Sequence, residues 1–151
     1  MTKPIELRAD GPHSAEYTMQ VAYVLDDAAR VLNHATMPGA GGLDYPGDAY
    51  RLLGALYTAT ERLPQLFAQL TAFLESQRDA GNLADDNGRN ATGQVALAAF
   101  RLAKAIQAAA TLTDELQAAQ NAISGLYIRE AGVTHEKGTE DGSGDNRGPR
   151  G

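Results

Sequence analysis

Histidine side chains can bind metal ions and transfer protons, so the three histidines are the first candidate functional residues. His13, His34 and His135 lie far apart along the chain, and no two of them have the i, i+4 spacing of a helical zinc site. His34 falls in the last turn of an expected helix, where an imidazole interacts favourably with the helix dipole. The sequence contains no cysteine, so thiolate ligands and a cysteine nucleophile are excluded. We therefore expect no metal site and no cofactor.

Two short motifs resemble ligand-binding loops but lack the required context. Residues 85–88 (Asp-Asp-Asn-Gly) suggest a calcium loop, yet Arg89 and Asn90 then stand where an oxygen ligand and a glycine are needed. Residues 39–42 (Gly-Ala-Gly-Gly) resemble part of a phosphate loop, which requires a preceding strand, whereas a helix is expected before them. We expect an Asx turn and an interhelical connection instead. No nucleophile–base pair is visible, so no catalytic residues are predicted.

Aromatic and apolar residues outside the main helical stripes are stronger candidates for binding. Tyr50 and Tyr57 are seven residues apart and lie beside the leucine stripe of their helix. Such rings either sit half-buried at the edge of a bundle or form a partner surface, where tyrosine is enriched. The last long helix adds four such residues: Leu97, Phe100, Tyr127 and Ile128. These six residues are the candidate interface.

The elements that would carry these residues are helical. The chain is poor in aromatic residues, at 6%, and its apolar residues are mostly alanine and leucine, which are strong helix formers. Apolar spacings of three and four predict helices over residues 15–36 and 46–80, and a heptad repeat predicts a third over 92–130. Pro64 interrupts the second pattern without changing its phase. We therefore expect a bend there and not a domain boundary.

The third predicted helix carries two heptad rows that form a coiled-coil-like seam. The first row contains Val95, Leu102, Ala109, Leu116 and Ile123. The second row contains Ala98, Ala105, Leu112, Ala119 and Leu126. The expected fold is all-α, an antiparallel bundle of three long helices over residues 14–132. An irregular arm, residues 1–13, precedes this bundle, and a disordered tail, residues 133–151, follows it.

The third helix is apolar on more than one side, which requires a covering surface beyond the bundle seam. We expect a second copy of the chain to provide it, because two-fold homodimers are the commonest oligomers. The alternative is that the N-terminal arm covers this helix through Ile5 and Leu7.

Charge and hydropathy limit the other classes of partner. The 151-residue chain has a net charge of −6, which disfavours nucleic acid and anionic lipid. No apolar run approaches the length of a membrane span, and the N-terminus lacks the apolar segment of a secretory signal. We expect a cytoplasmic protein with no membrane or nucleic-acid partner.

Residues 43–56 (Leu-Asp-Tyr-Pro-Gly-Asp-Ala-Tyr-Arg-Leu-Leu-Gly-Ala-Leu) and 62–66 (Arg-Leu-Pro-Gln-Leu) carry a resemblance. Over about residues 20–130 the chain is similar to a group of small all-helical proteins from actinobacteria, some of them carried on mobile elements. The resemblance implies a helical fold and transfers no catalytic residues. Small helical proteins of type VII secretion also form helical hairpins, but their Trp-x-Gly turn is missing, since the chain has no tryptophan.

These observations favour a non-enzymatic helical interaction or scaffolding module that self-associates. One alternative is a regulatory or toxin-neutralising partner protein encoded on a mobile element, because an acidic bundle can cover a basic target. Another is an enzyme whose carboxylates and tyrosines converge from facing helices.

Overall fold

The computed structural model describes residues 5–129, and the regular structure of this part of the chain is entirely α-helical. Its helices are α1 (Ala15–Ala35), α2 (Pro46–Thr60), α3 (Leu63–Asp79) and α4 (Ala91–Ala122). The predicted all-α class is confirmed. The predicted tail, residues 133–151, lies outside the described residues.

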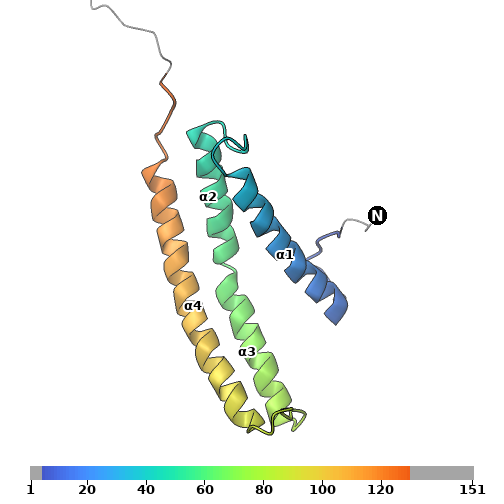
Figure 1. The fold of residues 1–151 in the computed structure, drawn as a ribbon. Helices are drawn as coiled ribbons and strands as arrows, with labels where there is room; N and C mark the ends of the chain where they lie inside the picture. The colour runs from blue at the N-terminus through green and yellow to red at the C-terminus, as the bar shows by residue number, and fades with distance from the viewer. Residues whose placement is uncertain (1–4, 130–151) are drawn as a thin grey trace, which may run out of the picture.

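α2 and α3 follow one another as a bent rod, and α4 packs antiparallel along both of them (Figure 1). The bend predicted at Pro64 is confirmed. The helix is interrupted at Glu61 and Arg62, which keep right-handed helical dihedral angles, and Pro64 is the second residue of α3. Proline is tolerated at this position because its missing N–H would have no helical partner there. The chain therefore bends without an extended linker.

The inside of the bend is closed by a polar contact to α4. Thr60 is buried, and its hydroxyl donates to the Tyr57 carbonyl at 2.9 Å. The hydroxyl of Thr113 on α4 lies within hydrogen-bond distance of the Thr60 hydroxyl, at 3.0 Å. A buried hydroxyl that is bonded in this way avoids the cost of an unsatisfied polar group. The contact therefore fixes the bend of α2–α3 against the middle of α4.

α2 begins with a cap formed by the Asp48 carboxylate. This group accepts hydrogen bonds from the backbone N–H groups of Tyr45 at 3.0 Å and Asp44 at 3.1 Å. Both bonds favour the ionised form, so they lower the pKa of Asp48 below its ordinary value of 3.8. At the other end of the hairpin, the Asn90 side chain caps α4 by accepting from the Thr92 N–H at 3.0 Å.

Replacement of Asp48 by alanine is expected to lower the melting temperature by a few degrees at neutral pH. Because the folded-state pKa is lowered, the cap contributes stability above the unfolded pKa and loses it as pH falls through the folded value. The gap between wild type and D48A should therefore close in strong acid. Thermal melts monitored by circular dichroism between neutral pH and pH ~2 measure this. A gap that stays constant with pH would show that the carboxylate charge is not involved.

The C-terminal end predicted for the third helix is wrong. α4 ends at Ala122, with Ile123 as its C-cap, and not at residue 130. The Gln120 side chain already donates to the Tyr50 carbonyl in the first turns of α2, at 3.1 Å. Tyr50 is only the fifth residue of α2, so α4 ends close to the level at which α2 begins. Gly125 then disfavours further helix through its backbone entropy.

The first heptad row of α4 faces α2 and α3. Val95 and Ala109 are each 6% exposed, and the other members of this row are half-buried. The second row is covered only at its start, because Leu112 is 47% exposed and Ala119 and Leu126 are also exposed. A straight α-helix drifts by about 20° per heptad against a 3.5-residue repeat. Thr113 therefore occupies the covered position that the repeat assigned to Leu112.

α1 stands apart from the hairpin. It diverges from α2 in Figure 1 and packs against none of the other three helices. Its connection to α2 is tightly built, because the Gly42 backbone approaches the Ala35 carbonyl too closely to leave room for a side chain. Gly39 and Gly41 adopt positive φ angles of 81° and 74°, which disfavour other residues. The single chain therefore forms a helical hairpin with a separate α1.

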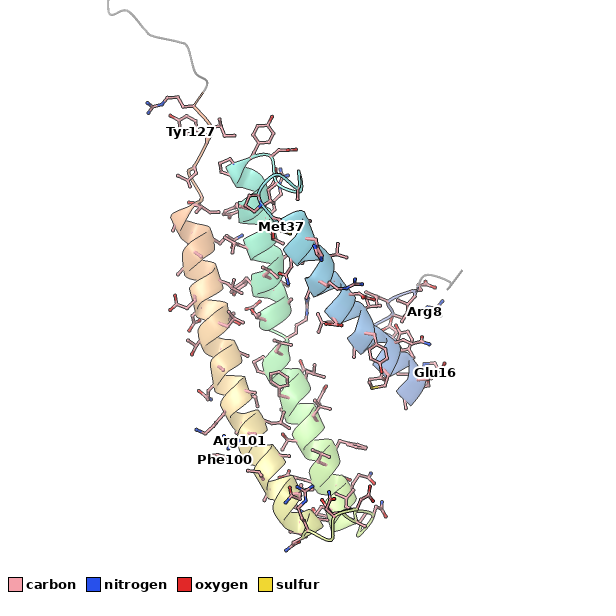
Figure 2. The ribbon with its side chains drawn as sticks, in the orientation of Figure 1. Arg8, Glu16, Met37, Phe100, Arg101 and Tyr127 are labelled. Carbon is pink, nitrogen blue, oxygen red and sulfur yellow. The ribbon has the colours of Figure 1, made fainter. Side chains whose placement is uncertain are left out.

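The N-terminal arm covers the first turns of α1, which differs from the alternative of an arm lying over α4. The Tyr17 hydroxyl accepts from the Arg8 N–H at 2.7 Å and donates to the Glu6 carbonyl at 3.1 Å. The His13 ring stacks on Tyr17 with ring centres 5.5 Å apart. Figure 2 shows Arg8 on the arm beside α1 and Glu16 in the first turn of that helix. Residues 5–13 of the arm therefore lie on α1 and not on the outward side of α4.

Removal of residues 1–36 is expected to leave the hairpin folded, because α1 contributes no packing to α2, α3 or α4. We expect the melting temperature to change by less than about 4 °C, which corresponds to less than about 1 kcal/mol for a domain of this size. Circular dichroism melts of the full and truncated chains at equal concentration test this. A much larger loss would show that α1 docks on the hairpin in solution.

Candidate interaction surfaces

The described chain buries little of its apolar surface. Val95 and Ala109 are the buried apolar residues within residues 5–129. Large hydrophobic side chains are exposed on every helix; examples are Leu25 and Val31 on α1, Tyr50 on α2, Phe73 on α3 and Phe100 on α4. Single exposed hydrophobic residues are normal, but contiguous apolar stripes mark interaction sites. Whether these exposed residues form continuous stripes on each helix therefore decides which surfaces are candidate interaction sites.

The structure distributes the six predicted interface residues over three places. Leu97 and Phe100 lie together on α4 and are 50% and 55% exposed. Tyr127 and Ile128 lie beyond the end of α4, where Figure 2 shows Tyr127 on the segment that leads away from the helix. Tyr50 and Tyr57 lie on α2. The six residues therefore do not form one continuous surface. Leu97 and Phe100 share a face of α4, whereas Tyr50 and Tyr57, seven residues apart, share a face of α2.

The two tyrosines of α2 lie at its edge with α4. The Tyr50 carbonyl accepts from Gln120 of α4. The half-buried Tyr57 donates to Glu61 on its own helix at 2.7 Å. This hydrogen bond to Glu61 is the main cause that raises the pKa of Tyr57, followed by desolvation and the negative charges of Glu61 and Asp114. The Tyr50 contact is made by its backbone, and the Tyr57 contact lies within its own helix, so the choice between a bundle edge and a partner surface stays a prediction.

The side of α4 that faces away from α2 and α3 carries its own stripe at spacings of three and four. We call this the outward stripe; all its members are exposed. Its members are Leu97, Phe100, Lys104, Ala108, Thr111, Glu115, Ala118 and Ala122. Figure 2 shows Phe100 and Arg101 on the side of α4 away from α3. α4 is therefore covered on one side by α2 and α3 and exposes a face of apolar, small and charged residues on the other.

Two cations surround the aromatic ring at the start of the outward stripe. The Lys104 ammonium lies 5.2 Å and the Arg101 guanidinium 5.8 Å from the centre of the Phe100 ring. Five other arginines, residues 8, 30, 51, 78 and 89, form ion pairs with nearby carboxylates. Arg101 and Lys104 form no ion pair with any other described residue. A half-exposed aromatic ring beside two cations is suited to a partner that offers apolar surface and negative charge.

Two further apolar stripes lie on the other helices. α3 exposes Leu66, Leu70 and Phe73 at spacings of four and three. α1 exposes Leu25, Val31 and Leu32. Periodicity shows which face of a helix is apolar but not which neighbour covers it, so the sequence pattern alone does not show that these stripes are exposed.

The described residues show little that favours catalysis. No group of three or more histidine, aspartate or glutamate residues among them is placed to hold a metal ion. A hollow of about 940 Å³ lies between the N-terminal arm and α1 and includes His13, Tyr17 and Asp27 among its lining residues. His13 and Asp27 are exposed there, and Asp27 forms an ion pair with Arg30 at 2.8 Å. Ligand and catalytic sites are usually enclosed, whereas these two side chains are open to solvent.

The motif at residues 85–88 forms the expected Asx turn. The Asp85 carboxylate accepts from the Asn87 N–H at 2.9 Å and pairs with the Arg89 guanidinium at 2.9 Å. The bond to Arg89 is the main cause that lowers the pKa of Asp85. The Arg89 guanidinium therefore binds the carboxylate oxygens that a calcium ion would need as ligands.

By length and composition, α4 is the helix in the described chain that could cross a membrane. An 18-residue window of it has a mean hydropathy of 1.4, and 11% of that window is buried. Core helices of soluble proteins meet the same criterion. The outward stripe also carries Lys104 and Glu115, and charged residues at membrane depth are costly. The opposite side of α4 packs on α2 and α3. The sequence predicted no apolar run of this length, whereas α4 meets the length and hydropathy criterion.

Comparison of the chain with protein-family models, with curated proteins and with solved structures found no match. The functional assignment therefore depends on the surfaces described above.

Proposed function

We propose that this protein is a non-enzymatic helical interaction module that functions by self-association, with α4 as its dimerisation surface. The observation that carries the proposal is how little apolar surface the helices bury against one another. Val95 and Ala109 are the buried apolar residues of the described chain, while stripes of apolar residues remain exposed. Burial of such stripes is the main favourable term in association. α1 and the α3 stripe remain available to a further partner, which suits a scaffolding role.

The first alternative is a regulatory or toxin-neutralising partner protein. Its support is the net charge of −6 and the exposed stripe on α3, which together could cover a basic target. The cations beside Phe100 make α4 itself a poor match for such a target. The second alternative is an enzyme that uses carboxylates and tyrosines. The hollow beside the arm is its support, and that hollow lacks buried carboxylates. Self-association is favoured because it uses the outward stripe of α4, which is the longest regular series of exposed residues on one helix face.

Site-specific cross-linking tests the proposal, because the chain contains no native cysteine. A cysteine that replaces exposed Gln107, at the edge of the outward stripe, is expected to form a covalent dimer with a short bifunctional maleimide. A cysteine that replaces exposed Ser76 on α3 is the matched control. Equal cross-linking at both positions, or none at Gln107→Cys, would contradict dimerisation through α4.

A further inference from the structure

The two halves of the outward stripe differ in size and charge. The N-terminal half is bulky and cationic, with Leu97, Phe100 and Lys104, and Arg101 lies beside it. The C-terminal half is small and anionic, with Glu115 followed by Ala118 and Ala122. Neither Lys104 nor Glu115 forms an ion pair with another described residue. A helix face with this polarity is complementary to a reversed copy of itself.

We propose that α4 pairs with α4 of a second copy in antiparallel orientation, about a two-fold axis that passes between Ala108 and Thr111. This inference deepens the proposed function and rests on it. In this register Lys104 of each chain lies opposite Glu115 of the other, because the two residues are equally far from the axis. A two-fold interface contains every contact twice, so two such ion pairs form.

The sizes of the side chains fit the same register. Leu97 and Ala122 are also equally far from the axis, so a large residue meets a small one. Phe100 lies opposite the alanines around Ala118. At the centre, Ala108 and Thr111 are small enough for the helix axes to approach within the 8–10 Å usual for packed helices. Large residues therefore meet small residues at both ends of the stripe.

A parallel pairing of the same faces is disfavoured by charge. It would place Lys104 against Lys104 and Glu115 against Glu115 of the second copy, and like charges across an interface are repulsive. The α3 stripe of Leu66, Leu70 and Phe73 contains no charged residue, so it has no cationic half and anionic half that a reversed copy could match. Charge complementarity therefore identifies a second α4 as the occupant of the outward stripe.

Charge reversal of the full-length chain tests the arrangement. Lys104→Glu and Glu115→Lys should each weaken dimerisation by roughly tenfold or more, because each converts two attractive pairs into repulsive ones. The double variant K104E/E115K should recover most of the wild-type affinity. A mixture of the two single variants should form a heterodimer in preference to either homodimer, because its facing pairs are again of opposite sign. Sedimentation velocity measures each state, and circular dichroism confirms that these exposed substitutions preserve helicity.

The outcomes separate the two levels of the proposal. If wild type itself stays monomeric, self-association fails and this inference fails with it. If wild type dimerises but the single reversals change nothing, or the double variant shows no recovery, the antiparallel register alone is overturned. Recovery in the double variant together with heterodimer formation from the mixed single variants supports the register. A loss of dimerisation at high salt in wild type adds independent support for the ion pairs.

Discussion

Replacement of Leu102 by aspartate is expected to destabilise the hairpin by about 3–5 kcal/mol, because it removes apolar packing and places an unpaired charge between helices. Leu102 belongs to the row of α4 that faces α2 and α3, and it is half-buried there. Leu116 lies in the same row with similar burial, so Leu116→Asp should have an effect of the same order. Urea denaturation monitored by circular dichroism measures both.

Leu112→Asp is the matched control, because it makes the same change in the same helix. The heptad repeat assigned Leu112 to the covered seam, whereas in the structure it is 47% exposed. We expect it to cost no more than about 1 kcal/mol, as is usual for a surface position. Equal losses for Leu102→Asp and Leu112→Asp would show that the heptad row, and not the drifted helix, faces the hairpin.

Replacement of Phe100 by glutamate is expected to abolish dimerisation while leaving helicity intact. Phe100 is 55% exposed on the outward stripe, and a two-fold interface would contain this ring twice. The loss of two aromatic anchors should weaken association by roughly hundredfold or more. The new carboxylate lies beside Arg101 and Lys104, so it is tolerated within the single chain.

Phe73→Glu on α3 provides the control, because Phe73 is 59% exposed and lies on a different helix face. The mass of this variant, measured by chromatography with light scattering, should match that of wild type. Equal loss of dimer in both variants would show that association depends on general apolar exposure. Loss in Phe73→Glu alone would move the interface to α3.

The sequence predicted the local structure more accurately than the packing. Periodicity located all the helices, and the unbroken phase across Pro64 identified the bend, because both depend on short-range patterns. The end of α4 was missed because it depends on the position of the start of α2, which is a contact between residues far apart in the sequence. The separation of α1 was also missed. Its apolar face is evident from the sequence, but the close approach of Gly42 to Ala35, which fixes the connection, is visible only in three dimensions.

The candidate surface was predicted only in part. Leu97 and Phe100 were identified because they fall outside the heptad rows, and they lie together on α4. Tyr127 and Ile128 were grouped with them on the assumption of a longer helix. Lys104 and Glu115 were not identified, because a charged residue on a helix suggests a partner contact only once the surrounding helix face is known to be exposed. The exposed stripe of α3 was missed for the same reason.

Self-association of the chain is the central claim, and sedimentation equilibrium of the full-length protein tests it most directly. Because an exposed helix face of this kind gives affinities that depend on details beyond its area, the concentration should run from micromolar to near-millimolar. We predict that the average mass rises with concentration from the monomer mass of 15.9 kDa toward twice that value. A mass that stays at the monomer value over the whole range would contradict the account.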